Sequence, residues 1–132
     1  MDWQKLFFTY TGRINRKEYW TGVIAVLGIW IFSAVILMNV FGQHSETGHL
    51  LETLIELPLG YAWINIGIKR YHDRGKSGWF MGVWFVLLIG GIYAWIFLLF
   101  PLLWYLFECG FLPGTNGPNV YDWVEAKSTR SQ

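Results

Sequence analysis

Three long apolar stretches dominate the pattern of hydrophobic and polar positions along the chain. The first runs from Tyr19 to Phe41 without a charged residue, the second from Leu50 to Ile68, and the third from Trp79 to Leu112. About 20 apolar residues in a helix cross the ~30 Å hydrocarbon core of a membrane, and a helix satisfies its own backbone there. The pattern therefore predicts an all-α fold, a polytopic transmembrane helical bundle, with spans at 19–41 and 50–68.

The third block, 79–112, is too long for one ordinary span. Its 34 residues would form a helix of about 51 Å at 1.5 Å per residue. The pair Gly90-Gly91 is the best helix breaker in the block, which favours a hairpin of one helix at about 77–89 and a longer one at about 92–110. The three apolar blocks are thus expected to form about four helices. The alternative is a single span that kinks at the glycines.

Short polar or mixed segments connect and flank these blocks. In residues 1–18, Trp3, Leu6, Phe7 and Tyr10 share one helical face, which predicts a short helix lying in the membrane interface. Residues 69–78 are expected to form a loop and residues 113–132 a tail. The whole chain, 1–132, is predicted to be a single membrane domain.

Composition excludes a water-soluble globule. Hydrophobic residues make up 54% of the chain and charged residues 14%, whereas soluble domains carry about 25% charged residues. The aromatic residues lie in the apolar spans and the cations in short flanking segments, so the sequence does not predict nucleic-acid binding.

The distribution of cations predicts the orientation in the membrane. Four of the ten Lys and Arg residues precede the first span, four lie in the segment 69–78, and the loop 42–50 has none. Short loops rich in Lys and Arg stay in the cytoplasm, so the N-terminus and the segment 69–78 should face it. Lys127 and Arg130 fit a cytoplasmic C-terminus as well, which needs an even number of crossings and favours the hairpin.

Three segments resemble the signature stretches of a known family. They read "GRINRKEYW" (12–20), "IKRYHDRGKSGW" (68–79) and "PGTNGPNVY" (113–121). Together they are similar to the YhaH-like small bacterial inner-membrane proteins, which are catalogued as domain of unknown function eight-hundred-and-five. The resemblance implies a multi-spanning helical protein of the bacterial inner membrane and supplies no activity. Where the family commonly continues with Gly and a further Pro, this chain has Asp122 and Trp123.

If the three segments meet on one membrane face, one polar cluster results. Its members would be Arg13, Arg16, Arg70, His72, Asp73, Arg74, Asn116 and Asn119, with Gly114 and Gly117 supplying tight turns. Arg side chains suit phosphate and carboxylate groups, so the leading hypothesis is a non-enzymatic site for an anionic lipid headgroup, a ligand or a protein partner. The alternative is purely structural, with Arg and Asp pairing across helix ends to lock the bundle.

An enzymatic role has less support. His72 is a candidate general base next to Asp73, but adjacent residues on a helix do not face each other, and no Ser or Cys nucleophile stands in a recognisable elbow. No cofactor is predicted. His44 and His49, with Glu46 between them, have metal-ligand chemistry, but a loop of this composition is ordinarily solvated and no metal site is predicted.

Glu56 supports a different function, that of a small transporter or channel component. It lies within the second apolar block, and a carboxyl at membrane depth often marks a path for ions or protons. Gly78 and Gly82 have the spacing of a close helix contact, within one chain or in a homo-oligomer.

Overall fold

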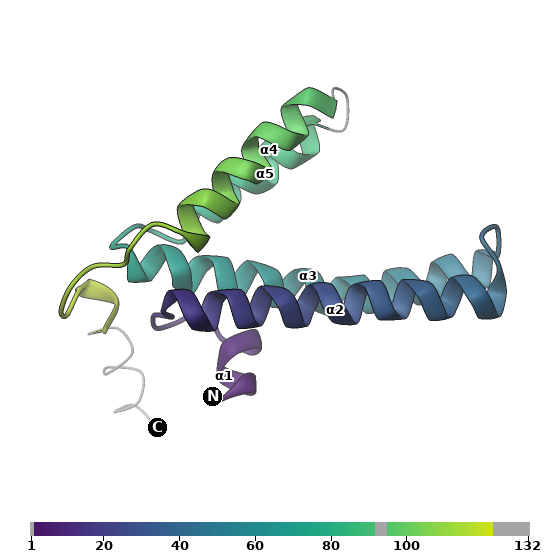
Figure 1. Cartoon of the computed structure of the whole chain (residues 1–132), viewed down its shortest axis with the longest axis horizontal. Helices are drawn as coiled ribbons and strands as arrows, with labels where there is room; N and C mark the ends of the chain where they lie inside the picture. Colours follow the sequence, from purple (N-terminus) through teal and green to yellow (C-terminus); the bar gives the residue numbers. More distant parts are fainter. Residues whose placement is uncertain (1, 92–94, 123–132) are drawn as a thin grey trace.

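The computed structural model describes residues 2–91 and 95–122 of the chain. These residues form five helices and no strand, which confirms the all-helical prediction for the part of the chain described (Figure 1). The helices are α1 (Trp3–Phe8), α2 (Arg16–Phe41), α3 (Glu46–Asp73), α4 (Trp79–Gly91) and α5 (Trp95–Gly110).

The helices α2 and α3 form a long antiparallel hairpin. Helix α2 begins at Arg16, before the predicted start at 19, because Asn15 and Glu18 form a capping box that satisfies backbone N–H groups at its start. It ends at Phe41 and is followed by the C-cap residue Gly42, whose φ of +80° suits glycine. Its 26 residues correspond to about 39 Å.

Helix α3 is longer than the predicted span 50–68 at both ends. It begins at Glu46, capped by Ser45, and continues to Asp73, so that the first half of the expected loop 69–78 is helical. The helix stops before Gly75, which has a φ of +68° that an α-helix does not accommodate. Of the cations in this segment, Lys69 and Arg70 therefore lie within α3, Arg74 is its C-cap residue, and Lys76 follows the helix.

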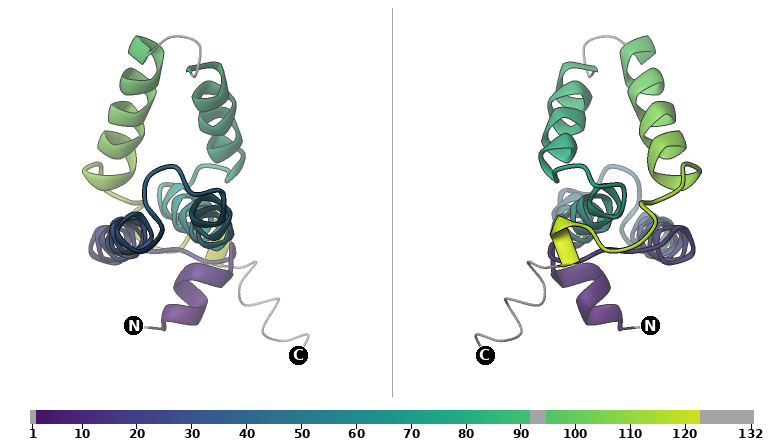
Figure 2. Two further views of the ribbon diagram at one scale, coloured as in Figure 1. Left: turned by 90° about the vertical axis from the view of Figure 1, so that its right-hand side faces the viewer. Right: turned by 90° about the vertical axis from the view of Figure 1, so that its left-hand side faces the viewer.

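The third apolar block folds as two helices, α4 and α5, that run antiparallel (Figures 1 and 2). Gly90 and Gly91 form the last residues of α4, and α5 begins at Trp95. With 13 and 16 residues, the two helices are about 20 and 24 Å long. The end-on views show this second hairpin rising away from α2 and α3.

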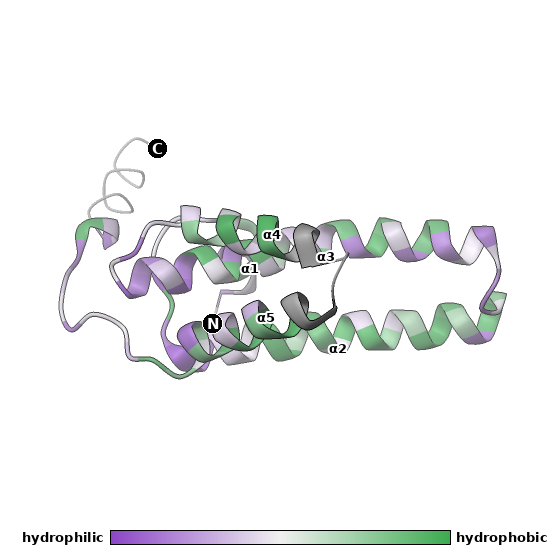
Figure 3. Ribbon diagram, turned by 90° about the horizontal axis from the view of Figure 1, so that it is seen from above, coloured by the Kyte–Doolittle hydropathy of each residue, from purple (hydrophilic) through white to green (hydrophobic). Residues whose placement is uncertain are grey.

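Hydropathy differs between the two long helices (Figure 3). Among the described residues, α2 is the one helix that is both long enough and apolar enough to cross a membrane. Helix α3 is longer, but hydrophilic residues interrupt its first half, which begins at Glu46. Helices α4 and α5 are apolar but shorter than a ~30 Å hydrocarbon core.

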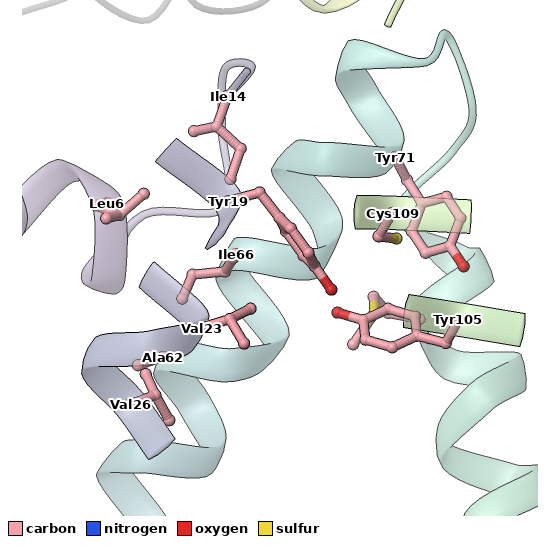
Figure 4. Packing of buried hydrophobic residues seen from close by; sticks show 11 residues of the cluster. Leu6, Ile14, Tyr19, Val23, Val26, Ala62, Ile66, Tyr71, Tyr105 and Cys109 are labelled. Atoms are coloured by element: carbon pink, nitrogen blue, oxygen red, sulfur yellow. The ribbon is translucent and has the colours of Figure 1, made fainter. Parts of the chain in front are cut away.

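The buried core lies where the two hairpins meet (Figure 4). The ring of Tyr105 on α5 has four aromatic neighbours with centroids 6.2 to 6.5 Å away: Tyr19, Trp63, Tyr71 and Trp84. The hydroxyl ends of Tyr19 and Tyr105 point toward each other from α2 and α5. This aromatic packing connects the hairpins near one end.

The short helix α1 packs against α3. Leu6 is buried in the core, whereas Trp3 and Tyr10 are exposed, so the four residues of the predicted interfacial face do not share one environment. Asn65 donates a hydrogen bond to the carbonyl of Phe7 (2.8 Å), and the ammonium group of buried Lys69 donates to the carbonyls of Lys5 and Leu6. Side chains of α3 thus satisfy carbonyls that the end of α1 leaves without helical partners.

Candidate functional site

The three segments 12–20, 68–79 and 113–121 meet at one end of the molecule, where α2 begins, α3 ends, α4 begins and α5 ends (Figure 1). We call the group that joins them the polar clasp. It consists of Arg13, Arg70, Asp73, Thr115 and Asp122.

Arg13 connects the first segment to the other two. Its Nε and Nη2 donate to Oδ1 of Asp73 at 3.1 and 2.9 Å, and its Nη1 donates to Oδ2 of Asp122 at 2.8 Å. The same guanidinium also donates to the carbonyls of Thr115 (3.0 Å) and Gly117 (2.8 Å). Burial acts to lower the pKa of Arg13, but the bonds to Asp122 and Asp73 outweigh it and raise the pKa.

Arg70 is completely buried, with 0% of its surface exposed. Its Nε donates to the carbonyl of Cys109 at 2.6 Å, Nη2 donates to the carbonyl of Leu112, and Nη1 pairs with Oδ2 of Asp73. A cation is favourable at the C-terminus of a helix, and here it binds the carbonyls at the end of α5. The two oxygens of Asp73 are therefore divided between a buried arginine and Arg13.

Glu108 forms a second ion-paired group on α5. Its Oε1 lies 2.6 Å from Nη1 of Arg74 and also accepts from the ammonium of Lys76. Glu108 is buried, and its role was not predicted because the sequence shows it only as an interruption of an apolar block. The ion-pair role of Glu108 could have been predicted from the excess of cations over acids in 69–78. Cations that become buried need acidic partners, and these must then come from another segment.

The segment 113–119 lies directly against the end of α3. Thr115 donates through its backbone N–H (2.7 Å) and its hydroxyl (2.8 Å) to the carbonyl of Asp73. Gly117 has the left-handed φ of +84° expected for a tight turn. Gly114 was predicted to supply a tight turn, but its role in the structure is steric. The absence of a side chain lets the backbone approach the Asp73 carboxylate closely.

The ring of His72 stacks on Tyr121, with centroids 3.8 Å apart and an interplanar angle of 9°. Its Nδ1 lies 3.3 Å from the carbonyl of Gly12, and Asn119 donates to the His72 carbonyl at 2.8 Å. Burial lowers the pKa of His72, although the Gly12 carbonyl opposes this effect. Among the described residues, the Asp73 carboxylate makes its bonds to arginines and none to the His72 ring, so the two do not form an acid–base pair.

The remaining candidates lie at the rim or elsewhere. Arg16 is exposed, with Nη1 3.3 Å from the carbonyl of Phe111. Asn116 is exposed, and none of the hydrogen bonds found within the described residues uses its side chain. Glu56 is far from the clasp along α3 and accepts a hydrogen bond from Nε1 of Trp30 at 3.0 Å. No group of three metal-ligating side chains occurs within 2–91 and 95–122.

At this end of the molecule each of the three acids is ion-paired within the chain, and one more cation than acid takes part in these pairs. Asp73, Asp122 and Glu108 face four cations: Arg13, Arg70, Arg74 and Lys76. Two further cations, Arg16 and Lys17, lie in the exposed first turn of α2.

Comparison with known proteins identifies the family of the chain. The model of the family described as "Protein of unknown function (DUF805)" matches residues 7–123. The chain belongs to this family. Curated relatives of this DUF805 protein occur in Escherichia coli strain K12. "Uncharacterized protein YiiR" is 28% identical (92% of this chain, 88% of the relative). "Inner membrane protein YhaH" is 27% identical (92% and 93%), and "Inner membrane protein YhaI" is 29% identical (89% and 86%).

No solved structure matches the DUF805 chain. The prediction of the family from the three segments is confirmed, and two of the relatives are named inner membrane proteins. Each of the three segments contributes at least one side chain or carbonyl to the clasp of this DUF805 protein.

Proposed function

We propose that this DUF805 protein is a multi-pass protein of the bacterial inner membrane, with the polar clasp and both termini on the cytoplasmic side. The names of its relatives, the apolar helix α2 and the gathering of cations at the clasp end support this proposal. In this arrangement the α2–α3 and α4–α5 hairpins both enter the membrane from the cytoplasmic face.

The clasp itself has a structural role in this proposal. The guanidinium groups of Arg13 and Arg70 direct their hydrogen bonds to carboxylates and carbonyls of the same chain. Removing one partner of a buried ion pair is costly, so an external anion would have to displace Asp73 to reach Arg70. The clasp holds the second hairpin to the first, and it is not the surface that an anion meets.

The exposed cations of α2 are the proposed contact for an anionic lipid headgroup. Arg16 and Lys17 occupy the first helical turn, where the helix dipole disfavours a cation and favours an anion. Beside them, the Trp20 indole donates to the Gly110 carbonyl at 3.1 Å and packs edge-on against Phe111, 5.7 Å away. Aromatic rings next to exposed cations are typical of a membrane interface. The exposure of Arg16 and Lys17, in contrast to the ion-paired arginines of the clasp, carries the proposal.

The test compares headgroup preference in matched variants. The full chain, purified in detergent, is mixed with phosphatidylglycerol and phosphatidylethanolamine, and retained lipid is measured by native mass spectrometry. The double variant Arg16→Gln/Lys17→Gln should lose most of the preference for phosphatidylglycerol, since each basic residue near the surface contributes about 1 kcal/mol. The control Lys127→Gln/Arg130→Gln removes the same charge and should keep the preference. An equal loss in both variants would contradict the proposed contact.

A further inference from the structure

A groove follows α4 from the polar clasp toward the middle of the second hairpin. It consists of three adjoining cavities with volumes of about 560, 180 and 780 Å³. The first and second share Ile64 and Met81 as lining residues, and the second and third share Trp84 and Pro101. The shared lining residues place the three cavities next to one another along α4.

The polarity of the lining changes along this path. At the clasp end, His72, Ser77 and Tyr10 contribute polar groups to the first cavity. The middle cavity is enclosed by the rings of Trp63, Trp84 and Tyr105 with aliphatic neighbours. The third is lined entirely by apolar residues of α4 and α5. None of the described residues that line the three cavities is Asp, Glu, Lys or Arg.

The length of the groove matches one leaflet of a membrane. Along α4 it extends from Trp79 to Leu87, a rise of eight residues or about 12 Å. This is close to half of the ~30 Å hydrocarbon core. A chain that enters at the clasp end would therefore reach the middle of the membrane at the far end of the groove.

We propose that the groove binds one acyl chain of an uncharged glycerolipid, with a glycerol hydroxyl at His72 and Ser77. Because Nδ1 of His72 faces the Gly12 carbonyl, the proton of the neutral ring belongs on Nδ1 and Nε2 remains an acceptor. The Ser77 Oγ accepts from the backbone N–H of Trp79 at 3.3 Å, which leaves its own O–H to donate. A hydroxyl can donate to Nε2 and accept from Ser77, whereas an anionic headgroup would meet no cation in the lining.

This inference concerns a different surface from Arg16 and Lys17, and it rests on the proposed membrane insertion. Two glycines that line the groove have room for a β-carbon. A β-carbon on Gly60 would have no atom within 4 Å, and one on Gly82 would have its nearest neighbour, an atom of the Trp79 ring, at 3.7 Å. Gly28 on α2 is equally open and lines none of the three cavities, so it provides the matched control.

The experiment uses the full chain reconstituted in phosphatidylethanolamine vesicles that contain a trace of dioleoylglycerol with a diazirine in one chain. After irradiation, labelled residues are mapped by mass spectrometry. Label is expected at Met81, Trp84 and their neighbours, with at least a tenfold decrease in Gly60→Leu and Gly82→Leu and parental labelling in Gly28→Leu. An excess of unlabelled dioleoylglycerol should compete, and phosphatidylglycerol carrying the same diazirine chain should label the groove less.

Groove labelling that survives both leucine variants, or that is equal for the phosphatidylglycerol probe, would overturn the proposal. Cross-links between copies formed by Gly60→Cys, together with absent groove labelling, would assign the groove to a second copy and overturn it as well. The exposed residues Phe32 and Val35 of α2 report insertion independently, because any chain-labelled lipid should reach them in the membrane. Label at these two positions with an unlabelled groove rejects the lipid site alone, and label at neither rejects the insertion.

Discussion

A β-carbon on Gly114 would lie 1.9 Å from Oδ2 of Asp73, so the backbone after α5 occupies the space beside the carboxylate that holds two arginines. Any side chain at position 114 must displace either this backbone or Asp73. Gly114→Ala should therefore loosen the clasp and lower the free energy of unfolding by roughly 1–3 kcal/mol, the usual cost of overpacking. Thermal unfolding of the detergent-purified protein measures this loss. Gly28→Ala, where the added carbon meets open space, should change the midpoint little, and an equal change in both variants would contradict the steric explanation.

Arg13 binds two carboxylates, Asp73 and Asp122, which differ in their other ion-pair partners. Asp73 also pairs with buried Arg70, whereas Asp122 pairs only with Arg13 among the arginines of the described chain. Asp73→Asn leaves the buried Arg70 guanidinium without its carboxylate partner and should lower the free energy of unfolding by about 3–5 kcal/mol. Asp122→Asn should cost much less, because this pair lies nearer to solvent. Chemical denaturation of the two variants side by side tests this, and similar losses would show that Arg70 does not depend on Asp73.

Much of this arrangement can be predicted from the sequence. Block lengths and the glycine pair at 90–91 predict two helices in 79–112, because the length of an apolar run limits how it can fold. The hypothesis that Arg13, Arg70 and Asp73 share one face comes from the three family-like segments, and the structure places these residues in contact. The prediction of two helices rests on composition and spacing, which a single sequence contains, whereas the meeting of the three segments rests on the resemblance to a family.

Pairings between distant residues are the part that could not be predicted. Lys69 looks like one of several orientation-setting cations, yet it is buried against carbonyls of α1, more than 60 positions away. Glu108 likewise joins Arg74 and Lys76 across more than 30 positions. Hydrophobic periodicity carries no information about which polar groups meet across the fold.

The contact of Lys69 with α1 predicts where the chain opens first when that cation is removed. Lys69→Met keeps the length of the side chain but withdraws the donor from the carbonyls of Lys5 and Leu6. Residues 3–8 should then exchange backbone hydrogens markedly faster, since so short a helix depends on its tertiary contacts. Hydrogen exchange followed by mass spectrometry measures this, with Lys17→Met at an exposed position as the control. Protection of 3–8 that is unchanged in Lys69→Met would show that the cap does not hold α1.

The burial of His72, whose ring stacks on Tyr121, should make the stability of the protein sensitive to acid. Burial lowers the pKa of His72 below its usual value near 6.5, so the folded protein binds a proton less readily than the unfolded chain. Stability from this group is therefore fully present above about pH 6.5 and is lost as the pH falls through the lowered pKa. The Asn119 N–H and Arg13 lower the pKa of neighbouring Asp122, which keeps that carboxylate ionised in this window. Melting curves between pH 7.5 and 5 should show a decrease in midpoint that His72→Phe, which retains an aromatic ring for the stack, largely abolishes. A midpoint that falls as steeply in His72→Phe would place the acid sensitivity on another group.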